Sequence, residues 1–353
     1  MKAILGVLLF LSSLRAGVIY DITDLGVLPG GTTTSAAAIS SNGNVAGSGD
    51  SASAISQAFL WTAAAGLQGI GSSLFAFGTG VNAAGLVVGY QWADDFSTYN
   101  AFLGNATGTA PIPTLGGANN AATGVNNAGT VVGYSDTLNG GTQAFSYSAG
   151  VLTALEGPDD SRANAINSGG AIAGQGDINE LTHPILWSGG TWTDLGVPSG
   201  FQSGYATAIA DGGYVAGTLN DGIGGTMAFV WQSGGMSEVG SLTSGGDSQA
   251  YGVNSSGWVV GTSDGTAFLY DGAAMYDLNA LLAPTTSAWQ LTEADAINNL
   301  GQIVGVGDID GDQHAFLLNP VSSTPEPASF ALVCAAMTLI AAKRRLRTKG
   351  KSR

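Results

Sequence analysis

One short pattern occurs seven times along this 353-residue chain, and it restricts the fold more strongly than any other feature. The pattern is Ile/Val-x-x-x-Gly-x-Val/Ile-Ala/Val-Gly. It begins at Ile39, Val81, Val125, Ile166, Ile209, Val253 and Ile297. Successive copies begin 41 to 44 residues apart. A nearly constant period of this length predicts seven copies of one supersecondary unit.

Each copy predicts four short strands. Its Asn-x-x-Gly segment, as in residues 126–129, contains residues that tolerate positive φ and predicts a tight turn between the first two strands. A third strand is predicted at segments such as 58–61 and 228–231, and a fourth at segments such as 192–196. Four antiparallel strands in about 43 residues are the size of a β-propeller blade.

The seventh copy has no fourth strand, because Leu318 is followed directly by Asn319 and Pro320. A matching fourth-strand sequence stands alone at residues 20–26 and is similar to residues 192–196. Pairing this N-terminal strand with the last repeat would close a ring and remove the open sheet edges. The sequence therefore predicts an all-β, seven-bladed β-propeller of four-stranded blades closed by the N-terminal strand. An open stack of repeats and two packed β domains are the alternatives.

The two ends predict export. Residues 1–16 combine a positive start, an apolar stretch and a small final residue, as a secretory signal peptide does. Residues 17–320 form the predicted ectodomain, and residues 321–353 form a C-terminal tail. In the tail, the apolar stretch 328–342 predicts a transmembrane helix of about 22 Å, short against a membrane core of about 30 Å. Snorkelling of the flanking Lys and Arg and local thinning of the bilayer can cover part of the gap. The basic residues 343–353 that follow should stay in the cytoplasm.

The tail resembles the PEP-CTERM sorting signal, because a Pro-Glu-Pro motif, a short transmembrane helix and an Arg-rich end follow one another in order. The matching positions are Pro325, Glu326, Pro327, Lys343, Arg344 and Arg345. The resemblance implies processing by an exosortase-type membrane enzyme. It also implies anchorage in the inner membrane before processing, and then a place on the cell surface or in the extracellular matrix of a cell that makes exopolysaccharide.

The repeats resemble the HAF family of extracellular repeats, in segments such as 301–305 and 314–317. The resemblance covers nearly all of residues 20–319, although only the last repeat keeps the His-Ala-Phe triplet. It implies an exported repeat protein and no defined activity.

The charge balance excludes nucleic acid as a partner. Between Gly17 and Thr324 there are 24 acidic residues and one basic residue, Arg162, which gives a net charge of −23. Such a surface repels phosphate backbones. An acidic polysaccharide would also be repelled unless a divalent cation bridged the two. The single cysteine, Cys334, lies in the tail, so the ectodomain has no disulfide.

Catalytic chemistry has few candidates in the ectodomain. His183 and His314 are the only histidines and occupy the same position in repeats four and seven, so they should not meet. Carboxylate pairs such as Asp94-Asp95 and Asp159-Asp160 leave open a polysaccharide hydrolase or lyase, since two carboxyl groups can cleave a glycosidic bond. Solvated loop acids are the simpler interpretation, and no catalytic residue is assigned.

No cofactor is predicted except calcium at one segment. Asp308, Asp310 and Asp312 alternate around a glycine, as at the start of a calcium-binding loop, but the distal Glu of an EF-hand is missing. A polar turn between two strands is the alternative.

Loop lengths vary on one predicted face only, the face with the second-third and fourth-first loops. Loops free to vary are where binding residues usually lie. The aromatic and acidic residues predicted for this face are Trp92, Asp94, Asp95, Phe96, Tyr99, Phe201, Tyr205 and Trp289. Together they predict a non-enzymatic surface protein that binds polysaccharide or a protein partner. A hydrolase or lyase and a purely structural matrix spacer are the alternatives.

Overall fold

The computed structural model describes residues 18–284 and 288–321, of which Tyr20–Pro320 form one compact unit. The predicted signal peptide and the sorting-signal residues 325–327 and 343–345 lie outside the described residues. So does the predicted transmembrane stretch 328–342. Among the described residues, no helix has the length and hydrophobicity needed to span a membrane.

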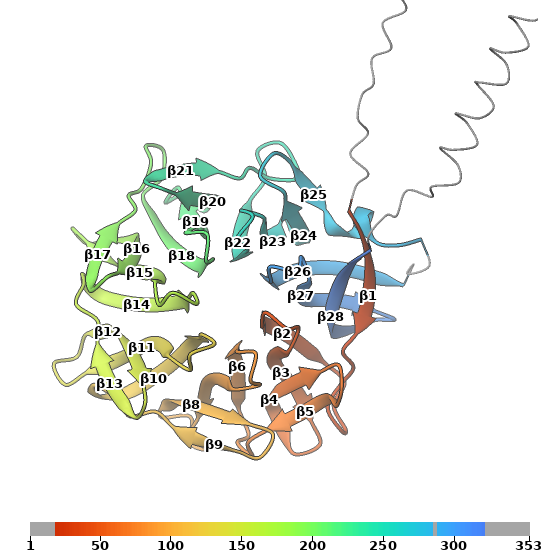
Figure 1. Cartoon of the computed structure of the whole chain (residues 1–353), viewed down its shortest axis with the longest axis horizontal. Helices are drawn as coiled ribbons and strands as arrows, with labels where there is room; N and C mark the ends of the chain where they lie inside the picture. The colour runs from red at the N-terminus through yellow and green to blue at the C-terminus, as the bar shows by residue number, and fades with distance from the viewer. Residues whose placement is uncertain (1–17, 285–287, 322–353) are drawn as a thin grey trace, which may run out of the picture. The chain divides into compact units, whose positions relative to one another are not determined.

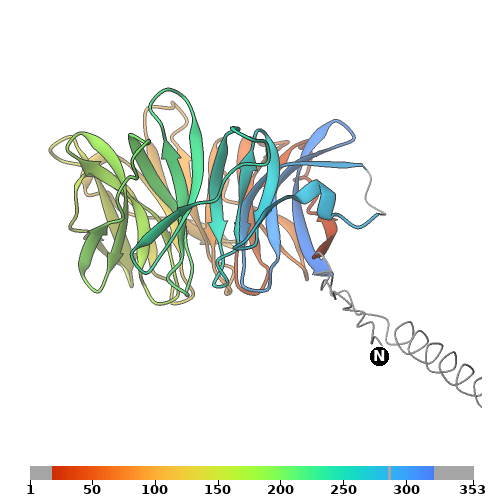
Figure 2. The same cartoon turned by 90° about the horizontal axis from the view of Figure 1, so that it is seen from above.

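Seven four-stranded sheets, or blades, are arranged in a ring within this unit (Figure 1; edge-on in Figure 2). Blades 1 and 2 contain β2 (Thr34–Ile39), β3 (Val45–Ser51), β4 (Ala54–Thr62), β5 (Gly66–Ile70), and β6 (Ala76–Val81), β7 (Val87–Trp92), β8 (Tyr99–Asn105), β9 (Gly108–Pro111). Blades 3 and 4 contain β10 (Gly116–Val125), β11 (Val131–Thr137), β12 (Thr142–Ser148), β13 (Val151–Ala154), and β14 (Asp159–Ile166), β15 (Ile172–Ile178), β16 (Leu181–Ser188), β17 (Thr191–Asp194). Blades 5 and 6 contain β18 (Ser203–Ile209), β19 (Val215–Asn220), β20 (Thr226–Gln232), β21 (Gly235–Glu238), and β22 (Ser248–Val253), β23 (Val259–Ser263), β24 (Thr266–Tyr270), β25 (Met275–Asp277), followed by the 3-10 helix η1 (Leu278–Leu281).

Blade 7 joins the two ends of the compact unit. It contains β26 (Trp289–Ile297), β27 (Ile303–Ile309) and β28 (Asp312–Val321), and its fourth strand is β1 (Ile19–Asp24). The order β26-β27-β28-β1 confirms the predicted seven-bladed propeller and its closure by the N-terminal strand.

The two glycines of each repeat have different structural roles. The first glycine ends the turn between strands one and two with φ of 75° to 87° in all seven copies, a region that side chains rarely adopt. The second glycine, such as Gly133, lies against the backbone of the first strand. A Cβ atom there would collide with the Ala121 carbonyl oxygen. The repeat therefore needs both glycines for geometric reasons.

A large apolar side chain from each third strand fills the core of its blade. These side chains are Phe59, Phe102, Phe145, Ile185, Phe229, Phe268 and Phe316, each at most 2% exposed. A core phenylalanine changed to alanine typically costs 3–5 kcal/mol, so these positions hold the blades together.

Neighbouring blades are also joined by a buried polar side chain on the first strand, which accepts a hydrogen bond from a third-strand N–H of the preceding blade. The pairs are Ala101–Asn120, Ala144–Ser161, Ala228–Ser248 and Ala315–Thr34, with distances of 2.8, 3.2, 2.9 and 3.0 Å. Blade 4 has Pro184 at this third-strand position and therefore no N–H to offer. The corresponding residue of blade 5 is Gly204, which has no side chain to accept one.

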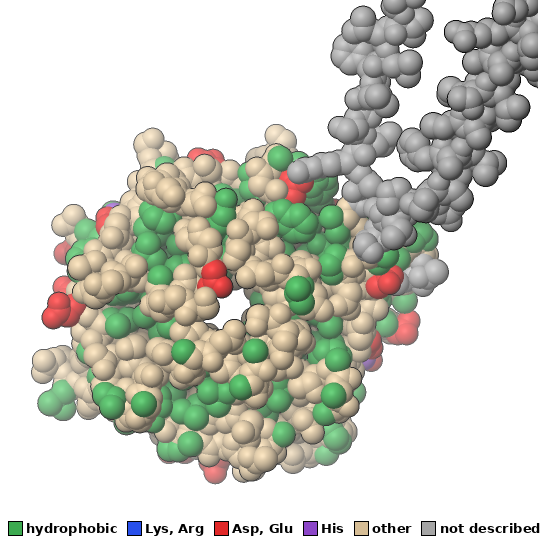
Figure 3. All heavy atoms as spheres, viewed as in Figure 1, with side chains coloured by type: hydrophobic (Ala, Val, Ile, Leu, Met, Phe, Trp, Pro, Cys, Tyr) green, Lys and Arg blue, Asp and Glu red, His purple; other side chains and the backbone are tan. Residues whose placement is uncertain are grey.

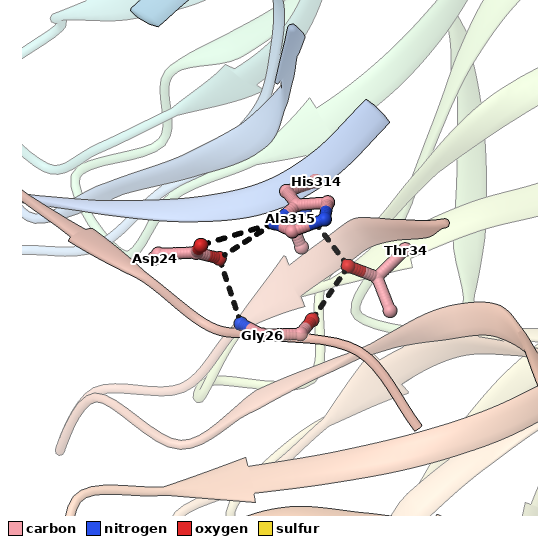
Figure 4. Close-up of polar contacts among 5 residues, drawn as sticks. All are labelled: Asp24, Gly26, Thr34, His314 and Ala315. Carbon is pink, nitrogen blue, oxygen red and sulfur yellow. Dashed lines mark hydrogen bonds and ion pairs between the residues drawn. The ribbon is translucent and has the colours of Figure 1, made fainter. Parts of the chain in front are cut away.

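The ring closes at the last of these pairs, as Figure 4 shows. The Thr34 hydroxyl accepts from Ala315 N–H and donates to the Gly26 carbonyl at 2.8 Å. It therefore connects blade 1 to β28 and to the segment that follows β1. The Asp24 carboxylate contacts His314 Nδ1 at 3.0 Å and accepts from Gly26 N–H at 2.8 Å. One side-chain cluster thus fixes β1 against β28.

We predict that Thr34→Val lowers the free energy of unfolding by about 1–3 kcal/mol, because valine keeps the shape but leaves a buried N–H and a carbonyl unpaired. Urea unfolding measures the loss. Ser248→Ala is the matched control, since Ser248 makes the same two bonds between blades 5 and 6. Hydrogen exchange in β1 should accelerate in Thr34→Val only. Equal exchange of β1 in both variants would show that Thr34 does not secure the closure.

Candidate functional site

The variable-loop face of blade 2 carries a line of half-buried aromatic side chains in mutual contact. Phe77 on β6 stacks on Tyr90 of β7 at a centroid distance of 5.1 Å. Tyr90 contacts Tyr99 of β8 at 5.8 Å, and Tyr99 contacts Trp92 at 5.0 Å. Antiparallel pairing places them together, since Phe77 lies opposite Tyr90 and Trp92 opposite Tyr99.

The line continues into blades 3 and 4. Tyr99 forms a side-chain hydrogen bond with Tyr134 of β11, and the Arg162 guanidinium of β14 lies 4.5 Å from the centre of the Tyr134 ring. Burial, with a smaller contribution from Tyr134, raises the pKa of Tyr99 to about 12. The only basic residue between Gly17 and Thr324 therefore lies at the end of this line. We call the line the aromatic row: Trp92, Tyr99, Tyr90, Phe77, Tyr134 and Arg162.

An exposed loop lies next to the row. Asp94, Asp95 and Phe96 connect β7 to β8, and Phe96 is 51% exposed, with its ring edge-on to Phe75 at 5.0 Å. Asp95 accepts hydrogen bonds from the Ser97 hydroxyl and N–H, and the hydroxyl bond lowers the pKa of the Asp95 carboxyl. The structure thus gathers Trp92, Tyr99 and the loop carboxylates in one blade.

The other three residues predicted for this face are not part of the row. Phe201 packs into the core of blades 4 and 5, and Trp289 packs edge-on against His314 and Phe316 of its own blade. Tyr205, on β18, lies near Tyr251 on the wall of the central channel. The predicted face is therefore built mainly from blade 2.

The first strand of every blade contains a β-bulge two residues before the repeat's Ile or Val. The bulge residues are Ala37, Thr79, Thr123, Asn164, Thr207, Tyr251 and Asp295. All seven line one cavity of about 200 Å³ in the central channel. Bulges redirect side chains, and here they turn one residue from each blade toward the channel.

Most of these bulge residues have a structural task. Thr79, Thr123 and Thr207 each donate to a backbone carbonyl of the next blade at 2.7–2.8 Å, and Asn164 does the same at 2.7 Å. Tyr251 and Asp295 do not follow this pattern. The Tyr251 hydroxyl instead donates to Gln249 Oε1 at 3.0 Å.

Asp295 forms a close carboxyl pair with Glu293, two residues earlier on β26. Burial raises the pKa of Asp295 well above its usual value, and the neighbouring Glu293 charge raises it further. Burial also raises the pKa of Glu293. The Oδ2 atom of Asp295 is buried and has no donor while both groups are ionised. The pair is therefore most stable with a positive charge, such as a proton, between the two groups.

The turns between strands one and two surround one opening of the channel. A cavity of about 170 Å³ there is lined by turn residues such as Asn126, Asn167 and Asp211. Side-chain amides connect successive turns, as where Asn126 donates to the Asn167 carbonyl at 3.3 Å. Figure 3 shows acidic side chains beside this central opening and around the rim, and no Lys or Arg on the face in view.

The predicted calcium segment is a tight hairpin turn. Asp308 pairs with Gln313 near the end of β27, Asp310 and Gly311 have φ of 54° and 98°, and Asp312 begins β28 and pairs with Ile309. Among the described residues, no group of three or more His, Cys, Asp or Glu is placed to hold a metal ion. The three aspartates thus follow the turn rather than surround one point, and calcium binding here stays a prediction.

Both histidines pair with an aspartate of the outer strand. His183 Nδ1 lies 3.0 Å from Asp194, and His314 Nδ1 lies 3.0 Å from Asp24. They occupy equivalent places in blades 4 and 7 and do not meet.

The sequence interpretation missed Glu293, Asp295 and Tyr251. A comparison of the seven repeats at the position two residues before Ile/Val would have singled out Tyr251 and Asp295, because the other five residues there are alanine, threonine or asparagine. It could not have shown that the position is a bulge facing the channel.

Comparison with known structures supports the fold. The β-propeller domain of the trilobed protease from Pyrococcus furiosus, described as having an open velcro topology, matches with a TM-score of 0.53 and 9% identity, over 88% of this chain and 100% of that one. YCF48 bound to D1 peptide matches with a TM-score of 0.51 and 12% identity, over 86% of this chain and 97% of that one. A lectin from Aleuria aurantia with α-methyl-L-fucoside has a lower TM-score of 0.38 at 12% identity, over 88% of this chain and 97% of that one. No family model matches the sequence, and a comparison with curated proteins gives no match. At such low identity, the first two structures support the β-propeller fold and nothing more specific.

We predict that Asp295→Asn stabilises the protein at neutral pH. A carboxyl whose pKa is raised by folding contributes stability below its unfolded pKa of about 4 and loses it as pH rises through the folded pKa. The wild type should therefore lose stability from about pH 4 upward, and the variant should lose less, by about 1–3 kcal/mol at pH 8. Melting temperatures from pH 4 to 9 test this, with Asp94→Asn in the exposed loop as control. Parallel pH curves for wild type and Asp295→Asn would contradict it.

Proposed function

We propose that this propeller is a non-enzymatic binding protein that recognises polysaccharide through its variable-loop face. The observation that carries this proposal is the aromatic row, which runs from the exposed loop of blade 2 to Arg162. Aromatic rings present an apolar surface to the C–H faces of a sugar, while carboxylates and hydroxyls bind its hydroxyl groups. Blade 2 supplies both kinds of group within one loop and two strands.

Charge narrows the ligand class. A net charge of −23 between Gly17 and Thr324 opposes direct binding of an acidic polymer. Neutral polysaccharides avoid this repulsion, and so do neutral segments of a mixed polymer. We therefore propose a neutral polysaccharide as the ligand of the aromatic row, with a surface protein as the alternative partner.

Binding is favoured over hydrolysis by the arrangement of carboxyl groups. Glycosidases hold two carboxyl groups about 5–10 Å apart across the scissile bond. Glu293 and Asp295 are in hydrogen-bond contact, which is closer than that, and Asp295 lines the channel rather than the aromatic row.

Export is part of the same proposal. The resemblance of residues 325–327 and 343–345 to a PEP-CTERM signal supports processing by an exosortase-type enzyme and delivery to the cell surface or matrix. Mass spectrometry of the mature protein from its own cells tests this: both termini should be shortened, and intact termini would argue against it.

We predict that Trp92→Ala weakens binding of a neutral polysaccharide at least tenfold, or about 1.4 kcal/mol, because aromatic side chains commonly dominate such contacts. Glycan arrays identify the ligand, and calorimetry measures the affinity. Trp192→Ala is the matched control, since Trp192 is 42% exposed on β17, the fourth strand of blade 4. Phe96→Ala tests the exposed loop beside the row without disturbing a half-buried residue. Equal binding by all the proteins would reject the row as the site, and absence of any glycan ligand would favour the structural spacer.

A further inference from the structure

The carboxyl pair of blade 7 occupies a position that the rest of the propeller uses for a different purpose. Four of the seven bulge residues donate a hydrogen bond to a carbonyl of the next blade. An ionised Asp295 can only accept, so it cannot replace these donors. In its ionised form Asp295 therefore does not make the bond between blades that these four residues make.

Burial makes the pair chemically incomplete. The carboxyl group of Asp295 is almost completely buried, although the residue as a whole is half-buried, and its Oδ2 atom has no donor. A buried carboxylate oxygen without a donor is costly, and the neighbouring Glu293 charge adds to the cost, although Glu293 itself has a side-chain hydrogen bond with Tyr251. A proton or a metal cation between the two carboxyl groups would offset this cost.

The groups around the pair supply oxygen and no positive charge. Tyr251 of β22 lies beside the pair, with Gln249 bonded to its hydroxyl, and Tyr205 of β18 lies near Tyr251. On the other side, β2 of blade 1 has Ser35 and Ala37 at the matching positions, which carry no charge. Val306 lies opposite Glu293 on β27. With oxygen donors only, the surroundings suit a hard cation such as Ca²⁺ rather than a transition metal.

We propose that Glu293 and Asp295 together bind a divalent cation, calcium in particular, inside the central channel, in place of the proton that they otherwise share. The two carboxylates are its charged ligands, and water completes the oxygen shell. Calcium fits better than magnesium because it accepts irregular coordination by six to eight oxygens, while magnesium requires near-ideal octahedral geometry. This site is independent of saccharide binding by the aromatic row.

Calorimetric titration of the full chain with CaCl₂ near pH 7.5 tests the proposal. With two protein carboxylates, the dissociation constant should lie at about 10⁻⁴–10⁻³ M, as in weak extracellular calcium modules. Repeating the titration in buffers of different ionisation enthalpy should show proton release, because the cation displaces the shared proton. Asp295→Asn should weaken binding at least tenfold, and Glu293→Gln should do the same.

The control separates the channel from the hairpin of blade 7. A variant with both Asp308→Asn and Asp312→Asn should keep wild-type calcium affinity and proton release. The proposal is wrong if the wild type binds no calcium up to about 10 mM, well above that range, which would leave the pair as a proton-sharing dyad. It is also wrong if binding survives Asp295→Asn and is lost in the hairpin variant. Because Asp295→Asn should be more stable than wild type at this pH, misfolding would not explain a loss of binding.

Discussion

The pairing of β1 with β28 is the contact on which the rest of the propeller depends. Without β1, the last strand of blade 7 would present a row of unpaired N–H and C=O groups, and the ring would have an open edge. Thr34 gives this closure a specific point of attachment, since its hydroxyl bonds to both partners of the joint. The two ends of the folded unit are therefore held by blade 1 as well as by each other.

Polar side chains between blades supplement the hydrophobic core. The first strand of most blades offers a buried hydroxyl or amide to a backbone group of a neighbouring blade, and the turns around the channel do the same with asparagine. A blade that slipped by one residue would leave these backbone groups unsatisfied, because side chains alternate between faces along a strand. With Cys334 outside the ectodomain, no disulfide can fix the register, and these bonds do so instead.

The repeat was sufficient to predict the propeller fold. It was not sufficient to predict which residues form the candidate sites, because that depends on packing and strand fit. The spacing of Ile/Val and glycine specifies strands and turns locally, and the missing fourth strand of repeat seven indicates its N-terminal partner. Trp92 and Tyr99 could be placed on one face because loop length and strand order determine that face. Phe201 and Trp289 could not be separated from them, since whether an aromatic ring caps a core or faces solvent depends on packing. The bulge that turns Asp295 inward results from the fit between two strands, and no single residue of the sequence specifies it.

A symmetric scaffold makes departures from symmetry informative. When seven equivalent positions share a structural role, a residue unable to fill that role lowers stability unless something else compensates. Pro184 and Gly204 both depart from the hydrogen bond that joins other neighbouring blades. Pro184 has no N–H to donate and Gly204 has no side chain to accept, so neither leaves a group without its partner. Asp295 has no such compensating neighbour in blade 1, where the corresponding residue is Ala37. Its compensation comes from Glu293 and from a positive charge that the pair attracts. The central channel, like the loop face, is therefore a place where one blade differs from the other six for a chemical reason.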